Sequence, residues 1–302
     1  MQTVPDLFVG VASGLLSALL FSAQNVVFKS QKEHITPADS NAIKVWVCLA
    51  FTAVVVFLPL RASVSSISLD SMFFLAVSVL FGAAFGDLAY LNSQNRVGVA
   101  VAFPIAHSYP VITYLFSVML LGEGFSVIRL IGVALVVVGI IPVSRNDVSN
   151  GKPDAETKGS VDRVGLALAA LTSVMLSVSA ILIQVGVSGI DAIDGNLVRM
   201  FFGSLVMLPI FVGGRISGKP LPSRRVSKVI ILASLFGFSI GSLFWVASIK
   251  YAGATISAVV GSIAPIFALP MSISGLKERV RWSTIAGTLV ATLGVVLAVI
   301  VV

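Results

Sequence analysis

The chain has 302 residues, of which 57% are hydrophobic and only 11% are charged, and its mean hydropathy is +1.04. A soluble protein of this length needs more charge to cover its surface, so the composition excludes that class and indicates a bilayer. The net charge of +7 is expected to lie in loops against anionic lipid, and no nucleic-acid partner is expected. The single cysteine, Cys48, excludes an intramolecular disulfide and a cysteine-rich metal site.

The apolar runs are long and do not alternate with polar residues, which predicts helices rather than the strands of a membrane barrel. The first run has no basic segment before it and is too long for a signal peptide. Because a spanning helix needs roughly twenty apolar residues, we predict an all-α integral membrane protein with ten transmembrane helices. In chain order they are Leu7–Phe28, Asn41–Leu60, Ser71–Gln94, Val97–Gly122, Ile128–Val143, Val164–Ile190, Gly195–Gly213, Val229–Ile249, Tyr251–Leu276 and Trp282–Val302. The fifth and the seventh are short by this length rule.

An internal repeat divides the chain at a polar segment, residues 144–162. A constant offset of 155 residues aligns the first unit, residues 1–143, with the second, residues 163–302, without a gap. Its most informative matches join residues that are scarce in this chain, namely Asp39 with Asp194, Asn41 with Asn196, Lys44 with Arg199, Pro110 with Pro265 and Glu123 with Glu278. Each unit holds five helices, so the second copy must be inverted in the membrane. Inverted repeats are a recurring plan of secondary transporters, whose substrate site lies near the midplane between the copies.

The basic residues predict the orientation of the chain. Alternate loops carry most of them, and we expect those loops in the cytoplasm. Few bases lie in the opposite loops, which hold Arg61, Arg129 and Lys250. Both termini are therefore expected outside the cell, in a multi-pass protein of the plasma membrane.

Three features of the sequence recur in a known family. A proline late in the fourth and ninth helices precedes an acid by thirteen residues, as in Pro110 to Glu123. A basic residue stands early in the second and seventh helices. A third feature is the run from Gly86 through Tyr90, with Gly98 and Phe103-Pro104 beyond it. Together these features resemble the drug/metabolite transporter superfamily, specifically its EamA-type ten-helix members. The resemblance covers nearly the whole chain, although Lys277-Glu278 departs from the Gly-Glu that the family has there.

The resemblance implies a central cavity lined mainly by the first, third, fourth, sixth, eighth and ninth helices. It implies alternating access without ATP and without a bound metal. It is specific for the fold and weak for the substrate, because such families carry amino acids, other metabolites, nucleotide sugars and drugs.

Asp87 is the sharpest candidate for chemistry, because it lies inside an otherwise apolar helix. An ionised carboxylate in hydrocarbon costs roughly 3 kcal/mol on insertion scales, so it should face the interior of the bundle. His107 lies near the middle of the fourth helix and is the side-chain type that titrates near neutral pH. We hypothesise that the two face one cavity and bind a proton or a substrate ammonium. The alternatives are a locally paired Asp at the membrane edge and a neutral His bonded to a hydroxyl.

Amides and aromatic side chains at membrane depth are further candidates for substrate binding. The amides could equally bridge helices, and the aromatics could equally anchor the protein at the interface. The predicted substrate-binding set is Gln24, Asn25, Asp87, Tyr90, His107, Tyr114, Gln184 and Trp245. The two histidines, His34 and His107, form no ligand cluster with each other, and no zinc, P-loop or dinucleotide motif appears. No metal and no cofactor is therefore expected.

Prolines, glycines and terminal charges are expected to shape the helices. Kinks at Pro104, Pro110, Pro265 and Pro270 could serve as hinges near a midplane site. Small-residue faces for close helix contact are predicted at Gly82, Gly86, Gly237 and Gly241. Structural or gating ion pairs are predicted for Glu123, which is near Arg129, and for Glu278. Lys44 and Arg199 are expected to pair with Asp39 or Asp194 or to extend toward the interface.

The sequence thus favours a secondary transporter, an exporter of small metabolites such as amino acids, with proton coupling left open. A carrier of drugs or organic cations is the alternative within transport. An intramembrane enzyme acting on lipid would need a catalytic cluster of acids or histidines at one membrane face, and none is visible. A receptor would normally carry a soluble sensory domain, for which the chain has no room. Ten helices can enclose a cavity alone, which favours a monomer.

Overall fold

The structure, a computed structural model, describes residues 4–31, 33–57, 66–97, 102, 105–149, 162–264, 266–267, 271 and 282–300. Within these ranges every regular element is helical. The first half contains α1 (Val4–Ser30), α2 (Pro37–Val56), α3 (Leu69–Val79), the π-helix η1 (Leu80–Ala84), α4 (Phe85–Val97), α6 (Tyr109–Leu121) and α7 (Val127–Ser149). The second half contains α8 (Arg163–Gly186), α9 (Ala192–Ile216), α10 (Arg224–Ala233), the π-helix η2 (Ser234–Ser239), α11 (Ile240–Gly261) and α13 (Trp282–Ile300).

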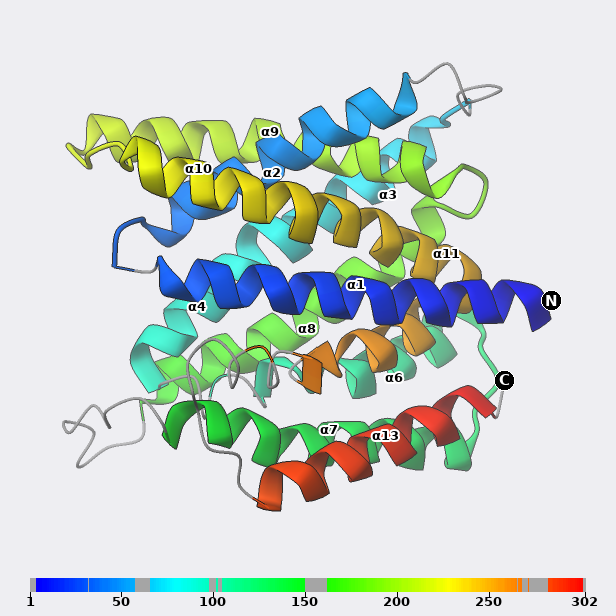
Figure 1. The fold of residues 1–302 in the computed structure, drawn as a ribbon. Helices are drawn as coiled ribbons and strands as arrows, with labels where there is room; N and C mark the ends of the chain where they lie inside the picture. The colour runs from blue at the N-terminus through cyan, green and yellow to red at the C-terminus, as the bar shows by residue number, and fades with distance from the viewer. Residues whose placement is uncertain are drawn as a thin grey trace.

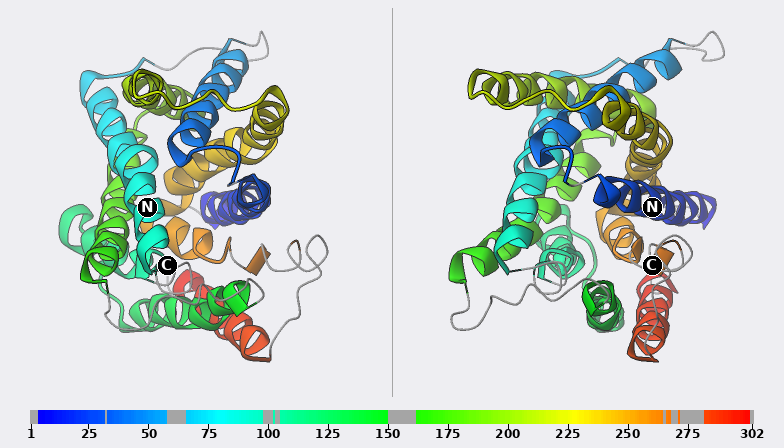
Figure 2. Two further views of the ribbon diagram at one scale, coloured as in Figure 1. Left: turned by 90° about the vertical axis from the view of Figure 1, so that its left-hand side faces the viewer. Right: turned by 60° about the vertical axis from the view of Figure 1, so that its left-hand side comes forward.

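The helices run roughly along one direction and pair across the two halves of the chain (Figure 1). α1 packs along α11, α2 packs against α9, α3 and α4 pack against α8, and α7 packs along α13. Figure 2 shows α7 and α13 together at one side of the bundle. The chain begins at one end of the bundle, where α13 also finishes, and we call this the terminal end. The opposite end, where α9 finishes and α10 begins, is called the basic end.

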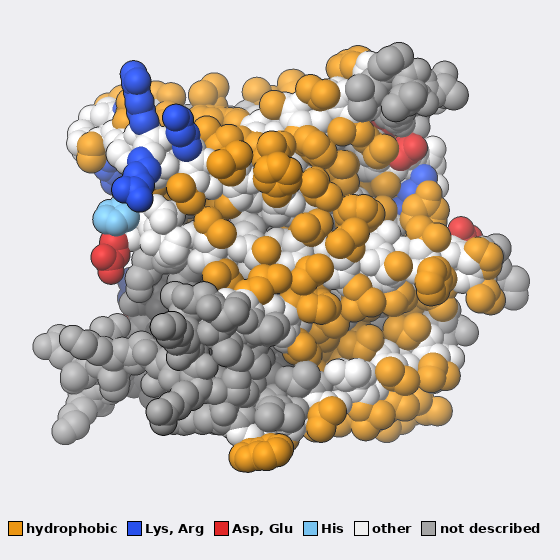
Figure 3. Space-filling model, in the orientation of Figure 1, with side chains coloured by type: hydrophobic (Ala, Val, Ile, Leu, Met, Phe, Trp, Pro, Cys, Tyr) orange, Lys and Arg blue, Asp and Glu red, His pale blue; other side chains and the backbone are white. Residues whose placement is uncertain are grey.

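On the face shown in Figure 3, apolar side chains cover much of the middle of the described surface, as a chain in lipid requires. Phe8, Phe73, Met119 and Leu289 are each more than 60% exposed although they lie on regular helices. Six spans are long and apolar enough to cross a bilayer, and three shorter apolar helices join them. Lipid contact explains these exposed side chains. The chain is therefore an integral membrane protein, while the count of ten helices stays a prediction beyond what the described residues show.

Of the two helices expected to be short, α9 is one of the six spans, whereas the apolar part of α7, Val127–Gly139, is one of the three shorter apolar helices. α7 has 23 residues and α9 has 25. Each continues past a proline inside the helix, Pro142 and Pro209 respectively. α7 also covers the first part of the segment expected to be a linker, up to Ser149.

Two predicted helix boundaries differ from the structure. Within the predicted helix Val97–Gly122, His107 and Ser108 form a turn, and α6 begins directly after it. Conversely, α11 passes through Lys250, the predicted boundary between two helices, and breaks at Gly253 with φ 81°. The hydroxyl oxygens of Ser248 and Ser257 lie 2.8 Å apart. A straight helix would separate them by about 13 Å, so the chain folds back at Gly253.

The two π-helices occupy equivalent positions in the repeat. η1 and η2 each interrupt the third helix of their unit, just before Gly86 and Gly241. Such turns leave the ordinary helical bonding pattern and are frequent at functional sites. The duplication therefore preserves a local backbone irregularity that the apolar pattern of the sequence does not reveal.

Candidate functional site

A charged pair joins two membrane helices of the first unit. The Nζ atom of Lys44 on α2 lies 2.9 Å from Oδ2 of Asp87 on α4. The side chain of Lys44 is 10% exposed and that of Asp87 is 35% exposed. The ammonium also lies 4.5 Å from the ring centroid of Phe238 on η2. Residues of both units therefore contact the Lys44 ammonium, and the carboxylate with which it pairs is still partly exposed. We call Lys44, Asp87 and Phe238 the ion-pair site.

The neighbouring π-helix is tied to the same helix that supplies Lys44. Asn41, one turn before Lys44 on α2, donates its amide Nδ2 to the carbonyl oxygen of Ala83 at 2.6 Å. A π-turn leaves carbonyl groups for partners outside the helix. α2 thus holds both the backbone of η1 and the carboxylate that follows it, so a shift of α2 must change both contacts.

The second unit replaces this ion pair with hydrogen bonds to uncharged side chains. Asn196 donates to the hydroxyl of Thr52 at 3.1 Å and accepts from Ser242 at 2.6 Å. Ser242 is the repeat equivalent of Asp87. Arg199, the equivalent of Lys44, donates through Nε to Ser78 at 3.2 Å and is buried. The site is therefore asymmetric, with its described carboxylate on the first unit.

The pairing expected for Lys44 differs from the one observed. Its neighbour Asp39 forms an ion pair with Arg215 at the end of α9, and Lys44 pairs with Asp87 instead. Sequence distance favoured Asp39, but helix packing brings α4 closer. The Asn41 and Asn196 roles were also missed, although their exact match in the repeat was a signal that they do similar work.

Tyr90 links the ion-pair site to His107. Tyr90 lies one turn after Asp87, so the two share a face of α4. Its ring meets that of His107 edge to face, with centroids 5.5 Å apart. The His107 ring also meets that of Tyr109, with centroids 6.3 Å apart. The structure thus brings Asp87, Tyr90 and His107 into one neighbourhood, and the shared cavity stays a prediction.

The remaining predicted binding residues are dispersed. Gln24 is buried on α1, where its Cβ lies 2.5 Å from the position that a Cβ on Gly237 would take. Asn25, the next residue, is exposed. Trp245 packs against Gly261 within α11.

Tyr114 is fully buried, and its hydroxyl donates to the carbonyl oxygen and accepts from the amide of Ser126. Because those bonds close the turn between α6 and α7, we leave Tyr114 out of the proposed site.

A second polar cluster surrounds the break in α11. The amide N–H of Ala254 donates to the side-chain oxygen of Gln184 on α8 at 2.5 Å. Glu123, between α6 and α7, accepts from the hydroxyl of Thr255 at 3.1 Å and from Arg129 at 3.4 Å. Acceptors near the first turn of a helix satisfy its free N–H groups and interact favourably with its dipole. This cluster, which we call the terminal-end cluster, fastens the helix that follows Gly253 to α6, α7 and α8.

The structure places Pro110 in the first turn of α6, after the turn at His107, rather than in the middle of a helix. There its missing N–H leaves no helical bond unmade. Gly82 and Gly86 face α8, and Gly237 and Gly241 face α1, each with a side chain within 4 Å of the place that a Cβ would take. The other predicted hinge and charge positions, Pro104, Pro265, Pro270 and Glu278, lie outside the described residues.

Two further features bear on chemistry. An apolar groove of about 410 Å³ lies between α2, α3 and α9, and none of the predicted binding residues lines it. It is lined by Leu49, Ala53, Met72, Leu197, Val198, Phe201 and Phe202. In the described part of the chain no group of three or more His, Cys, Asp or Glu side chains could hold a metal ion. The ion-pair site, rather than the groove, holds the polar groups that could recognise a solute.

Paired helices from two repeated units around a charged pair in an apolar bundle are the features of a membrane transporter. The chain belongs to the EamA-like transporter family, whose model matches residues 8–145 and again residues 163–300. The two matches begin at the same offset as the repeat found in the sequence.

Known relatives agree with this assignment. An uncharacterized transporter of Archaeoglobus fulgidus is 25% identical over 296 residues, which cover 95% of this chain and 96% of that one. Another from the same organism is 38% identical, but over only 93 residues, about a third of either chain. A solved crystal structure shares the fold across 97% of both chains, with a TM-score of 0.77 and 15% identity. The likeness to that structure concerns the fold alone.

Proposed function

We propose that the protein is a secondary carrier that exports small metabolites such as amino acids by alternating access, with Asp87 at its binding site. The observation that carries this proposal is the ion pair of Lys44 with Asp87. A charged pair in a membrane helix bundle is costly to keep and marks a substrate or ion pathway. The Asp87 side chain is 35% exposed, so a solute or a proton could reach its carboxylate.

In this proposal, binding works by exchange of partners. A substrate ammonium, or a proton, takes the place of the Lys44 ammonium on the Asp87 carboxylate. Lys44 then loses its counter-ion, and α2 loses one of its two ties to the η1–α4 segment. Because α2 packs against α9 of the second unit, its release changes the contact between the units. Tyr90 and His107 form the wall beside the carboxylate and pass or hold the proton.

The terminal-end cluster closes one end of the pathway. Glu123 holds Thr255, and Gln184 holds Ala254, at the fold-back of α11. Opening that end requires these bonds to break. The fold-back at Gly253 and the helix start at Pro110 act as hinges in this motion, and we propose the same role for Pro104, Pro265 and Pro270.

The remaining architecture follows the repeat. We propose ten helices in two inverted units, residues 1–143 and 163–302, joined by residues 144–162. The carrier works as a monomer in the cell membrane, with both termini outside. Cysteines introduced singly at each end of the bundle and labelled with an impermeant thiol reagent in whole cells test this orientation.

The test is uptake of a panel of amino acids and other metabolites into proteoliposomes, with and without an imposed pH gradient. We expect accumulation of at least one solute and its loss in Asp87→Asn. The matched control is Asp70→Asn, which removes an exposed carboxylate from the start of α3. Equal transport by wild type and Asp87→Asn contradicts the proposed site. If accumulation is the same with and without the pH gradient, proton coupling is contradicted but the carrier and its site at Asp87 are not.

An organic-cation carrier is the second candidate. Phe238 already lies over the Lys44 ammonium, and an aromatic face beside a carboxylate attracts cations in general. Transport of a lipophilic cation, without inhibition by any amino acid, would favour this candidate over the first.

A further inference from the structure

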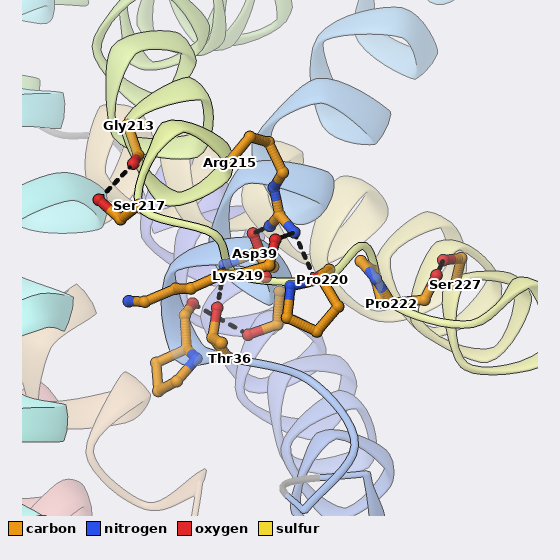
Figure 4. A network of polar contacts seen from close by, with 11 residues as sticks. Thr36, Asp39, Gly213, Arg215, Ser217, Lys219, Pro220, Pro222 and Ser227 are labelled. Carbon is orange, nitrogen blue, oxygen red and sulfur yellow. Dashed lines mark hydrogen bonds and ion pairs between the residues drawn. The ribbon is translucent and has the colours of Figure 1, made fainter.

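The turn between α9 and α10 is a folded platform at the basic end. Arg215 donates to the carbonyl oxygens of Lys219 and Pro220 and pairs with Asp39 on α2 (Figure 4). Gly218 takes a positive φ of 80°, which lets the chain turn tightly between them. These contacts give the turn a fixed shape and attach it to the first turn of α2.

Four basic side chains project from this platform. Lys219, Arg224, Arg225 and Lys228 are all exposed, and none has an ion-pair partner among the described residues. Three of them lie in the first two turns of α10. Positive charge there opposes the helix dipole and costs stability. Figure 3 shows Lys and Arg side chains gathered at this end, beside the apolar surface.

Exposed apolar side chains accompany these bases. Ile216 is 83% exposed and Leu221 is 67% exposed, one on each side of Lys219. Val226 and Ile230 of α10 are buried against the bundle, so the bases lie on its outer face. Bases beside exposed aliphatic side chains at the end of membrane helices match the boundary between headgroups and acyl chains.

We propose that this platform, residues 215–228, is a binding site for the headgroup of an anionic phospholipid. The phosphate lies among Arg224, Arg225 and Lys228, while Ile216 and Leu221 contact the acyl chains. The occupant is a lipid rather than a free phosphate because the bases adjoin a surface that must itself lie in the bilayer. Arg215 and Asp39 connect the platform to α2, which carries Lys44, so the bound lipid stabilises the helix that forms the ion-pair site. The site does not depend on which solute is carried.

The experiment is native mass spectrometry of the detergent-solubilised full chain, titrated with phosphatidylglycerol or with phosphatidylcholine of the same acyl chains. Each base near an anionic membrane surface contributes about 1 kcal/mol, or roughly fivefold in affinity. We expect Arg224→Gln/Arg225→Gln to weaken phosphatidylglycerol binding about 25-fold and to leave phosphatidylcholine binding unchanged. The matched control is Arg96→Gln/Arg163→Gln, which removes two charges where α4 ends and α8 begins and should bind phosphatidylglycerol as wild type does.

Three results would overturn the proposal. If both double variants lose the same amount of affinity for phosphatidylglycerol, the effect is one of net charge and the platform is not a specific binding site. Equal affinity of wild type for the two lipids would show no headgroup preference. Protection from thermal unfolding by inorganic phosphate alone, as strong as that by phosphatidylglycerol, would make this a site for a soluble anion.

Discussion

The Lys44 ammonium on α2 and the Asp87 carboxylate on α4, 43 positions apart in the chain, form an ion pair of 2.9 Å. Removing one member leaves the other charge without its partner in an apolar bundle. For fully buried pairs this costs about 3–5 kcal/mol, and since Asp87 is partly exposed we expect about 2 kcal/mol for Lys44→Met. The double variant Lys44→Met/Asp87→Asn should recover most of that loss in the free energy of unfolding.

A double-mutant cycle measured by thermal unfolding in detergent checks this expectation. The control cycle pairs Lys44→Met with Asp70→Asn, which shares no contact with it, and those effects should add. Additive effects in the Lys44–Asp87 cycle would mean that the two side chains do not stabilise each other.

Glycine permits the close approach of α7 and α13. A Cβ on Gly139 would lie 2.5 Å from the backbone nitrogen of Ala291 and 2.6 Å from the carbonyl oxygen of Gly287. Backbone atoms cannot rotate away, so Gly139→Ala should lower the free energy of unfolding by about 1–3 kcal/mol. Gly213→Ala is the control, because nothing lies within 4 Å of its Cβ position. It should be neutral or stabilising, by about 0.5–1 kcal/mol. Equal effects of the two changes in thermal unfolding would contradict this packing.

Gln184 supplies the acceptor for the Ala254 amide at the break in α11. Gln184→Leu leaves that buried N–H without its partner, at a cost of about 1–3 kcal/mol. Hydrogen exchange at Ala254 and Thr255 should therefore become at least fivefold faster, at about 1.4 kcal/mol per tenfold. Gln31→Leu just after α1, where the side chain donates a hydrogen bond to Ser30, should leave these amides unchanged. Unaltered exchange in Gln184→Leu would show that α11 needs no such cap.

Asp162 connects the start of α8 to the end of α4. The backbone N–H of Gly165 and the guanidinium of Arg96 hold the pKa of Asp162 below its usual value. The folded state therefore favours the ionised form, and this stabilisation is present above the ordinary Asp pKa of about 3.9. It is lost as the pH falls through the lowered pKa. In Asp162→Asn, which can still cap the helix, no such titration occurs. The difference in melting temperature between wild type and variant should shrink on acidification, and a constant difference would exclude this linkage.

Much of the fold could be predicted from the sequence, because lipid forces each spanning segment to be long and apolar. Val4–Ser30 and Trp282–Ile300 lie close to the predicted first and last helices. The errors arose where one residue was taken as a boundary. Lys250 is charged and so suggested the end of a helix, but its ammonium donates to the carbonyl oxygen of Ile190, so α11 can continue past it. The break comes instead at Gly253, where the positive φ suits glycine.

The site was harder to predict, because its contacts join helices distant in the chain. Asp87 is conspicuous in the sequence because a carboxylate is rare in an apolar helix, yet the sequence does not show that its partner is Lys44. The π-helix before Asp87 accepts a hydrogen bond from Asn41 at Ala83, and hydrophobic periodicity does not predict such a tertiary contact. The repeat did mark Asn41 and Asn196 as a matched pair, which indicated a shared role.

Counterflow tests the central claim most directly, namely that the chain is a carrier with alternating access at Asp87. Proteoliposomes are loaded with unlabelled solutes of the amino-acid and metabolite panel, and uptake of each labelled solute is followed without any ion gradient. The account predicts that internal solute accelerates uptake of its labelled counterpart, and that Asp87→Asn loses the acceleration while Asp70→Asn keeps it. Uptake that is independent of internal solute, or counterflow that survives Asp87→Asn, would contradict it.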